Sequence, residues 1–162
     1  MTNVDVKIKN EHGNFKYRVA GVLKCDDKYL FVRMGYNEFF CLPGGHIELC
    51  EDSVTAAKRE LTEELGFDVE VKNLLAIHEN FYEKKGKFHE MCYYYLAEPM
   101  DKNYVAENFN RTEMDKEGPV DHEFKWFTLS ELSSQKIRPE ILKTILQENK
   151  NQIQHYITKE WS

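Results

Sequence analysis

Residues 45 to 67 read GHIELCEDSVTAAKRELTEELGF, and this stretch decides the fold. It follows directly on Gly44 and turns helical where Asp52 or Ser53 offers a polar N-cap. Apolar residues recur at helical spacing and should share one buried face: Val54, Ala57, Leu61 and Leu65. Gly66 then ends the pattern, as glycine does just past a helix. The sequence predicts a helix over roughly Ser53 to Leu65.

Three glutamates lie on a different side of the same helix. Glu60, Glu63 and Glu64 stand at i, i+3 and i+4, which places their carboxylates on one patch. Like charges so close repel by a few tenths of a kcal/mol per pair, so a counterion stabilises the helix. A solvated helix face is the commoner interpretation of such a cluster. The glycine pair beside the helix favours a divalent cation instead, because it brings a backbone carbonyl close to the carboxylates.

Strands are expected on both sides of this helix. Residues 16–24 and 28–34 predict a hairpin across Cys25-Asp26-Asp27, and residues 39–42 a brief buried strand that Pro43-Gly44-Gly45 ends in a loop. Residues 67–81 and 88–97 predict two further strands, the second of them central in the sheet because it is almost wholly apolar or aromatic. Residues 124–127 predict a last short strand.

The remaining segments are less regular. Residues 101–121 are polar and without a clear period, which predicts a long loop that covers the site. Residues 129–132 predict a helical turn and residues 139–149 an amphipathic helix. The polar tail from residue 150 to 162 has no clear assignment and is expected to be peripheral. The whole chain, 1–162, is expected to form a single domain.

Composition limits the partners. The 162 residues are 41% hydrophobic and 31% charged, as in a folded domain, and a net charge of −6 provides no surface for duplex nucleic acid or anionic membranes. Residues 1–5 do not resemble a signal peptide and no apolar run is long enough to cross a bilayer, so we expect a cytoplasmic location without a membrane partner. The scattered cysteines form no CxxC pair and are expected to be reduced thiols: Cys25, Cys41, Cys50 and Cys92.

The stretch from 45 to 67 resembles the Nudix box. Gly45, five residues, Glu51, seven residues, Arg59-Glu60-Leu61, one residue, Glu63-Glu64, one residue and Gly66-Phe67 match its fixed positions. Such a match arises by chance on the order of once in a million chains of this length. The resemblance and the β-β-β-α-β-β-β-α order of elements imply an α/β fold, a Nudix-type α/β/α sandwich with a mixed β-sheet.

The same resemblance implies an activity of the MutT-like type. It is metal-dependent hydrolysis of a diphosphate linkage in a small nucleotide-type substrate, either a nucleoside diphosphate derivative or a nucleoside triphosphate. Mg²⁺ is the expected cofactor, with Mn²⁺ as a substitute, and its ligands are the Gly45 carbonyl and the side chains of Glu60, Glu63 and Glu64. The same three glutamates and Arg59 are the expected catalytic residues. Arg59 orients a glutamate, and Glu51 either braces Arg59 or contacts the metal.

Several points stay open at the level of sequence. The general base is a box glutamate or one of the acids in 101–123, among which Glu117 and Glu123 are preferred. Tyr82 is placed as in dinucleoside polyphosphate hydrolases, which argues against ADP-ribose. A non-catalytic, nucleotide-sensing Nudix-like module is the main alternative function, and an isoprenoid diphosphate isomerase that uses Cys41 or Cys50 is a weaker one. Whether the chain forms a homodimer is also open.

Overall fold

The computed structural model describes residues 3–148 and 151–161 and is built around one large mixed sheet. The strands are β1 (Lys7–Asn10), β2 (Gly13–Cys25), β3 (Lys28–Met34), β4 (Gly44–His46), β5 (Val69–Glu83), β6 (Lys87–Pro99), β7 (Phe109–Asp115), β8 (Gly118–Thr128) and β9 (Gln154–Glu160). The helices are α1 (Ser53–Leu65), α2 (Leu129–Leu132) and α3 (Ile141–Gln147). The order across the sheet is β7-β8-β3-β2-β6-β5-β9, with β1 and β4 paired to β2.

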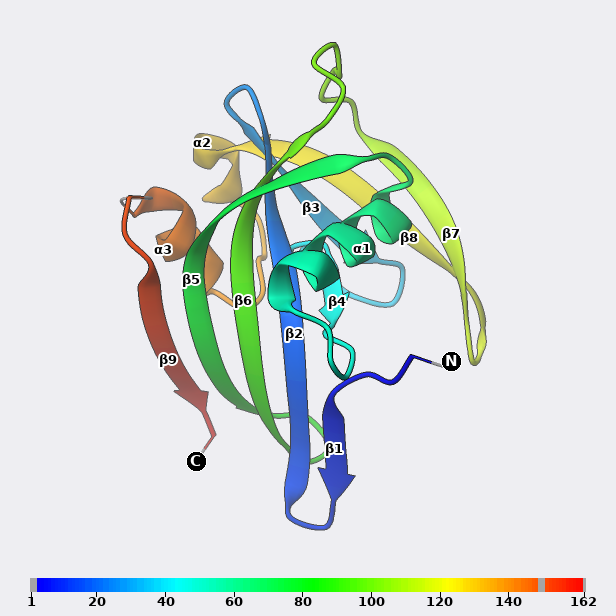
Figure 1. Cartoon of the computed structure of the whole chain (residues 1–162), viewed down its shortest axis with the longest axis vertical. Coiled ribbons are helices and arrows are strands. Elements are labelled where there is room, and N and C mark those ends of the chain that lie inside the picture. The colour runs from blue at the N-terminus through cyan, green and yellow to red at the C-terminus, as the bar shows by residue number, and fades with distance from the viewer. Residues whose placement is uncertain (1–2, 149–150, 162) are drawn as a thin grey trace.

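Helices cover the sheet on both faces (Figure 1). On β2, Gly21 faces α1 so closely that an added Cβ would collide with Leu61. The alternate residues of β2 point the other way, where Ala20 and Val22 share a core cluster with the buried side of α3. This arrangement confirms the predicted α/β sandwich with a mixed sheet. Within the described residues, no helix is long and apolar enough to span a membrane.

The sheet is split where the box begins. Strands β2 and β3 pair only at Lys24↔Tyr29 and Cys25↔Lys28, the two register pairs next to their hairpin turn. Beyond that point the two strands separate, and residues 41–46 run between them. Cys41 exchanges backbone hydrogen bonds with Val32 of β3, and β4 pairs with β2 on the other side. The beginning of the box therefore lies in the plane of the sheet, at its centre.

Helix α1 has the predicted boundaries. Its N-cap is Asp52, whose side chain accepts a hydrogen bond of 2.9 Å from the Thr55 N–H. Its C-terminal end is Gly66, at φ 79°, a left-handed conformation that favours glycine. The predicted apolar face is wrong at Val54, which is 47% exposed, whereas Ala56, which was not assigned to that face, is buried.

Several predictions made from local pattern are wrong. Residues 39–42 form isolated bridges rather than a strand, and Gly44-Gly45 belongs to β4 rather than to a loop. Residues 101–121 are not one long loop, because β7 and the start of β8 form a hairpin there. The last helix is shorter than residues 139–149: it begins at Ile141 and ends at Gln147, and residue 149 lies outside the described residues.

The other sequence assignments hold. The hairpin of β2 and β3, the pair β5 and β6, the strand around residues 124–127 and the turn α2 are present, and β6 lies between β2 and β5 as a central strand. The tail, which the sequence left without assignment, contributes β9, a parallel partner of β5 from Ala76↔Gln154 to Tyr82↔Glu160.

Candidate active site

The glycine pair brings backbone against the carboxylates of α1. A Cβ on Gly45 would occupy the position of the Glu60 carboxylate, and a Cβ on Gly44 would collide with the backbone of Val19 and Ala20 in β2. Only glycine fits at both positions. Carboxylate oxygen fills the space that the missing side chains leave. A backbone carbonyl and carboxylates therefore lie close together here, and both are oxygen donors of the kind that hard divalent cations prefer.

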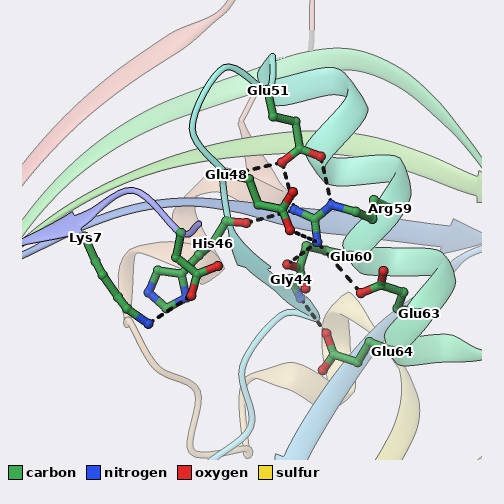
Figure 2. Close-up of polar contacts among 10 residues, drawn as sticks. Lys7, Gly44, His46, Glu48, Glu51, Arg59, Glu60, Glu63 and Glu64 are labelled. Atoms are coloured by element: carbon green, nitrogen blue, oxygen red, sulfur yellow. Dashed lines mark hydrogen bonds and ion pairs between the residues drawn. The ribbon is translucent and has the colours of Figure 1, made fainter. Parts of the chain in front are cut away.

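Arg59 is the centre of the hydrogen-bond network in Figure 2. Its Nε donates to Glu51 Oε1 and its Nη2 to Glu51 Oε2, both at 2.8 Å, which is a two-pronged pair. Its Nη1 donates to Glu60 Oε1 at 2.7 Å, and Nη2 also donates to the His46 carbonyl at 3.1 Å. The guanidinium thus ties the helix to the loop before it and fixes the Glu60 carboxylate. Hydrogen bonds from Arg59 also lower the pKa of Glu51.

The role of Glu51 can now be separated from that of Glu60. Both of the Glu51 oxygens bond to Arg59, and Oε2 also accepts the Glu48 N–H at 3.0 Å. Glu51 thus bonds Arg59 as the bracing role requires, and its contact with a metal stays a prediction. Glu60 keeps Oε2 beside Gly45 and free of Arg59.

Glu64 is held in a different environment from the other two glutamates. Its Oε2 accepts the Gly44 N–H at 2.8 Å. Burial raises the pKa of Glu64 to about 8, and the Gly44 N–H and the charge of Arg18 act against that shift. Burial also raises the pKa of Glu60, against the opposing hydrogen bond from Arg59. Two carboxyls that are costly to ionise stand beside the glycine pair, and a cation between them stabilises their charged forms.

Glu63 is more exposed than the other two glutamates of the box helix. Its side chain is 65% exposed, and its Oε2 lies 3.8 Å from Arg59 Nη1. Figure 2 shows Glu60, Glu63 and Glu64 leaving the same side of α1 at different levels. Within residues 3–148 and 151–161, no three or more His, Cys, Asp or Glu side chains are gathered closely enough to hold a metal ion. The ligand set of Gly45, Glu60, Glu63 and Glu64 therefore stays a prediction.

The acidic residues of β7, β8 and the turn between them differ in whether they lie near the box. Glu113 on β7 faces α1, and its charge raises the pKa of Glu64 after the larger effect of burial. Glu117 lies next to the β7–β8 turn, where its N–H donates to Asp115. Glu123 is held by Lys125 at 2.8 Å and by Arg33 Nε at 3.0 Å, and these bonds lower its pKa. Among these three acids, Glu113 alone acts on the box by its charge.

Comparison with known proteins identifies the family. The model of the NUDIX domain matches residues 16–147, most of the chain. An ADP-ribose pyrophosphatase of Methanocaldococcus jannaschii is 38% identical over 63 residues, which are 37% of this chain and 37% of that protein. A MutT-like protein of Streptomyces ambofaciens is 41% identical over 38% of this chain and 41% of its own. The matches thus span little more than a third of these curated relatives.

Solved structures show the same fold at lower identity. A MutT NUDIX hydrolase from Burkholderia pseudomallei superposes with a TM-score of 0.63 at 20% identity, over 83% of this chain and 98% of that one. The Ap4A hydrolase of C. elegans superposes with a TM-score of 0.55 at 20% identity, over 82% of this chain and 92% of that one. The chain belongs to the Nudix family, and the resemblance of its box is confirmed.

Proposed function

We propose that this chain is a metal-dependent hydrolase that cleaves a diphosphate linkage in a nucleoside diphosphate derivative or a nucleoside triphosphate. The observation that carries the proposal is the Arg59 network, in which one guanidinium holds Glu51 with two bonds and leaves one Glu60 oxygen beside Gly45. A solvated helix face has no need of such a fixed arrangement. The similarity to an ADP-ribose pyrophosphatase and, in fold, to an Ap4A hydrolase supports a substrate of this class.

The residues fit a divalent cation of the Mg²⁺ type, with Mn²⁺ as the natural substitute. The Gly45 carbonyl, Glu60, Glu63 and Glu64 would hold it, and it would supply charge neutralisation to phosphoryl oxygens and lower the pKa of a bound water. Arg59 keeps Glu60 in position through the reaction, and Gly44 fixes Glu64 by its N–H. The exposure of Glu63 supports a role for it as a metal ligand or, if it leaves the metal to the other residues, as the base that accepts a proton from an attacking water.

The identity of the substrate calls for a direct assay. Purified protein is given dinucleoside polyphosphates, nucleotide sugars, ADP-ribose and nucleoside triphosphates, with Mg²⁺, with Mn²⁺ or with a chelator, and the release of phosphate and nucleotide is measured. We expect turnover that requires metal and is highest for one class. ADP-ribose is the most informative member of the panel, because the two available arguments disagree about it. The position of Tyr82 argues against ADP-ribose as the substrate, and the similarity to an ADP-ribose pyrophosphatase argues for it.

One variant tests the mechanism directly. Glu63→Gln keeps the shape of the side chain and removes its charge, so metal-dependent turnover should fall sharply if Glu63 is a ligand or a base. Full turnover by Glu63→Gln contradicts the proposed roles. Tight binding of a nucleotide without any turnover by the unmodified protein supports the nucleotide-sensing alternative instead.

A further inference from the structure

The face of the sheet opposite α1 carries a group of polar side chains close to the box. Arg18 of β2 lies on this face, because its neighbours in the alternation, Ala20 and Val22, pack toward α3. Lys16 pairs with Glu90 in the parallel register of β2 and β6, so Arg18 and Glu90 are diagonal neighbours. Asn80 of β5 is the direct partner of Glu90. Polar residues from three adjacent strands therefore meet on one surface.

Within this group, Arg18 and Glu90 are incompletely bonded. Glu90 is only 7% exposed, and its ion-pair partner is Arg18, with 3.6 Å between Nη1 and Oε2. That separation exceeds the length of a direct hydrogen bond. The Arg18 Nε is buried and has no hydrogen-bond partner in the described part of the chain. The Glu90 carboxylate is nearly buried and the Arg18 side chain is 31% exposed, so the two retain acceptor and donor capacity that a ligand can use.

His78, Thr158 and Asn80 on the same face bond to one another. His78 is fully buried, and its ring nitrogens lie 3.2 Å from the Tyr94 hydroxyl and 2.7 Å from Thr158 Oγ1. Thr158 in turn donates to Asn80 at 2.9 Å. This network links β9 to the centre of the sheet and is internally satisfied. Buried polar atoms without a partner in the described part of the chain also occur on this face at His46 Nε2 and the Tyr156 hydroxyl. Arg18 and Glu90 are distinguished from them as a pair of opposite charges that are not directly bonded.

The pair lies beside the box. Arg18 is the register partner of His46, the residue that follows Gly45. On the side of the Arg18–Glu90 pair away from the box, Tyr82 of β5 pairs with Phe88 of β6. Their rings are stacked, with 4.9 Å between the ring centroids. A ligand with its diphosphate at the box has the Arg18–Glu90 pair and then an aromatic wall next to it.

We propose that Arg18 and Glu90 are the residues that select the nucleobase of the substrate. The carboxylate accepts from a ring N–H donor and the guanidinium donates to the adjacent ring acceptor, a pattern that the edge of a nucleobase presents. This inference rests on the proposed function, since it assumes that the diphosphate is bound at the box. It assigns specificity to two residues outside the box helix.

The test compares substrates with and without a base. Glu90→Gln is assayed on the best nucleotide of the panel and on ribose 5-diphosphate, which lacks the base. The expected result is a tenfold or greater fall in kcat/KM on the nucleotide, mainly through KM, and no change on ribose 5-diphosphate. Glu98→Gln is the matched control, because Glu98 is on the same strand, pairs with Lys72 at the surface and should leave both values unchanged. Equal losses on both substrates, or none on the nucleotide, overturn the proposal.

Two additions keep this test decisive. If Glu90→Gln does not fold, Arg18→Lys replaces it, since lysine keeps the charge and loses the planar donor geometry, and the same split between substrates is expected. Calorimetric binding of α,β-methylene nucleoside triphosphates, which resist cleavage, separates this inference from the hydrolase. Weaker binding of the analogue by the variant, together with no turnover of the cleavable nucleotides by either protein, supports base selection and contradicts hydrolysis. Unchanged binding and turnover in the variant contradict base selection alone.

Discussion

Arg59 and Arg18 lie near the same glycine pair and both face glutamates, but they are bonded very differently. Arg59 makes two bonds of 2.8 Å to Glu51 and one of 2.7 Å to Glu60. Arg18 approaches Glu90 only to 3.6 Å and leaves its Nε without a partner in the described residues. The difference indicates two tasks. A fully bonded guanidinium maintains the geometry of a site, whereas an incompletely bonded one is available to a ligand.

The largest expected effect comes from removing the charge of Glu64, a glutamate of the box helix that carries Arg59. Glu64→Gln keeps the volume and an oxygen that accepts the Gly44 N–H, but it loses the carboxylate charge. We expect kcat to fall on the order of 100-fold or more, with the fold retained. Initial rates at saturating substrate and metal measure the loss, and thermal unfolding checks the fold. Glu70→Gln, at an exposed ion pair with Lys72, is the control. Unchanged kcat in Glu64→Gln contradicts a role for this carboxylate.

The next effect tests whether the two-pronged geometry of Arg59 is what the site requires. Arg59→Lys keeps the positive charge and cannot bond both Glu51 oxygens while holding Glu60. We expect a fall of about 10- to 100-fold in kcat, as for residues that orient ligands. The free energy of unfolding should fall by about 1–3 kcal/mol, because Glu51 loses partners while partly buried. Steady-state kinetics measures the change in kcat, and urea unfolding measures the change in the free energy of unfolding. Full activity in Arg59→Lys would show that the positive charge alone is sufficient.

The Arg59 side of the comparison was predictable from sequence, and the reason is local. Helix α1 follows from spacing, capping and a terminal glycine within a short segment, and these signals act over a few residues. The position of Arg59 beside Glu51 likewise follows from one loop and one helix. The exposed Val54 is the exception, because which first-turn residue meets the sheet depends on how the helix is docked.

The Arg18 side was not predictable, since it depends on pairing between distant strands. Arg18 and Glu90 meet only because β2 and β6 pair in parallel with a specific register. The same limit explains the missed hairpin of β7 and the unassigned β9. Their sequences, FNRTEMD and QHYITKE, are largely polar and have no strong apolar face. Both are edge strands, and pairing with the neighbouring strand is what makes them strands. The cue that was available was an arginine, Arg18, directly before the apolar run VAGVL of β2.

A smaller effect tests the satisfied network beside the Arg18–Glu90 pair. Burial lowers the pKa of His78 from 6.5 to about 4, so the folded protein holds this ring neutral. The unfolded chain takes up a proton below pH 6.5 and the folded chain does not. The stabilisation is therefore complete above pH 6.5 and is lost as the pH falls toward 4, by on the order of 1–3 kcal/mol. Urea unfolding between pH 7 and 4.5 measures this loss.

Two variants isolate the contribution of His78 from that of other groups. His78→Asn should show a shallower fall in stability with acidification than the unmodified protein, because the titrating ring is gone. His12→Asn, at an exposed position, should follow the unmodified protein. If the unmodified protein and His78→Asn depend on pH in the same way, the buried ring is not the group that titrates.

The smallest effect concerns the acids outside the box. Glu113 faces α1 and acts on Glu64 through its charge, so Glu113→Gln should change kcat by about two- to fivefold, as expected for partly exposed charges. Glu117 stands at the hairpin turn, bonded through its backbone to Asp115, and Glu117→Gln should leave kcat within about twofold. A general base costs on the order of 100-fold when it is removed. If kcat falls by that much in Glu117→Gln, the β7–β8 hairpin must fold over the box when substrate binds. If it falls by that much in Glu113→Gln, Glu113 is the general base in place of Glu63.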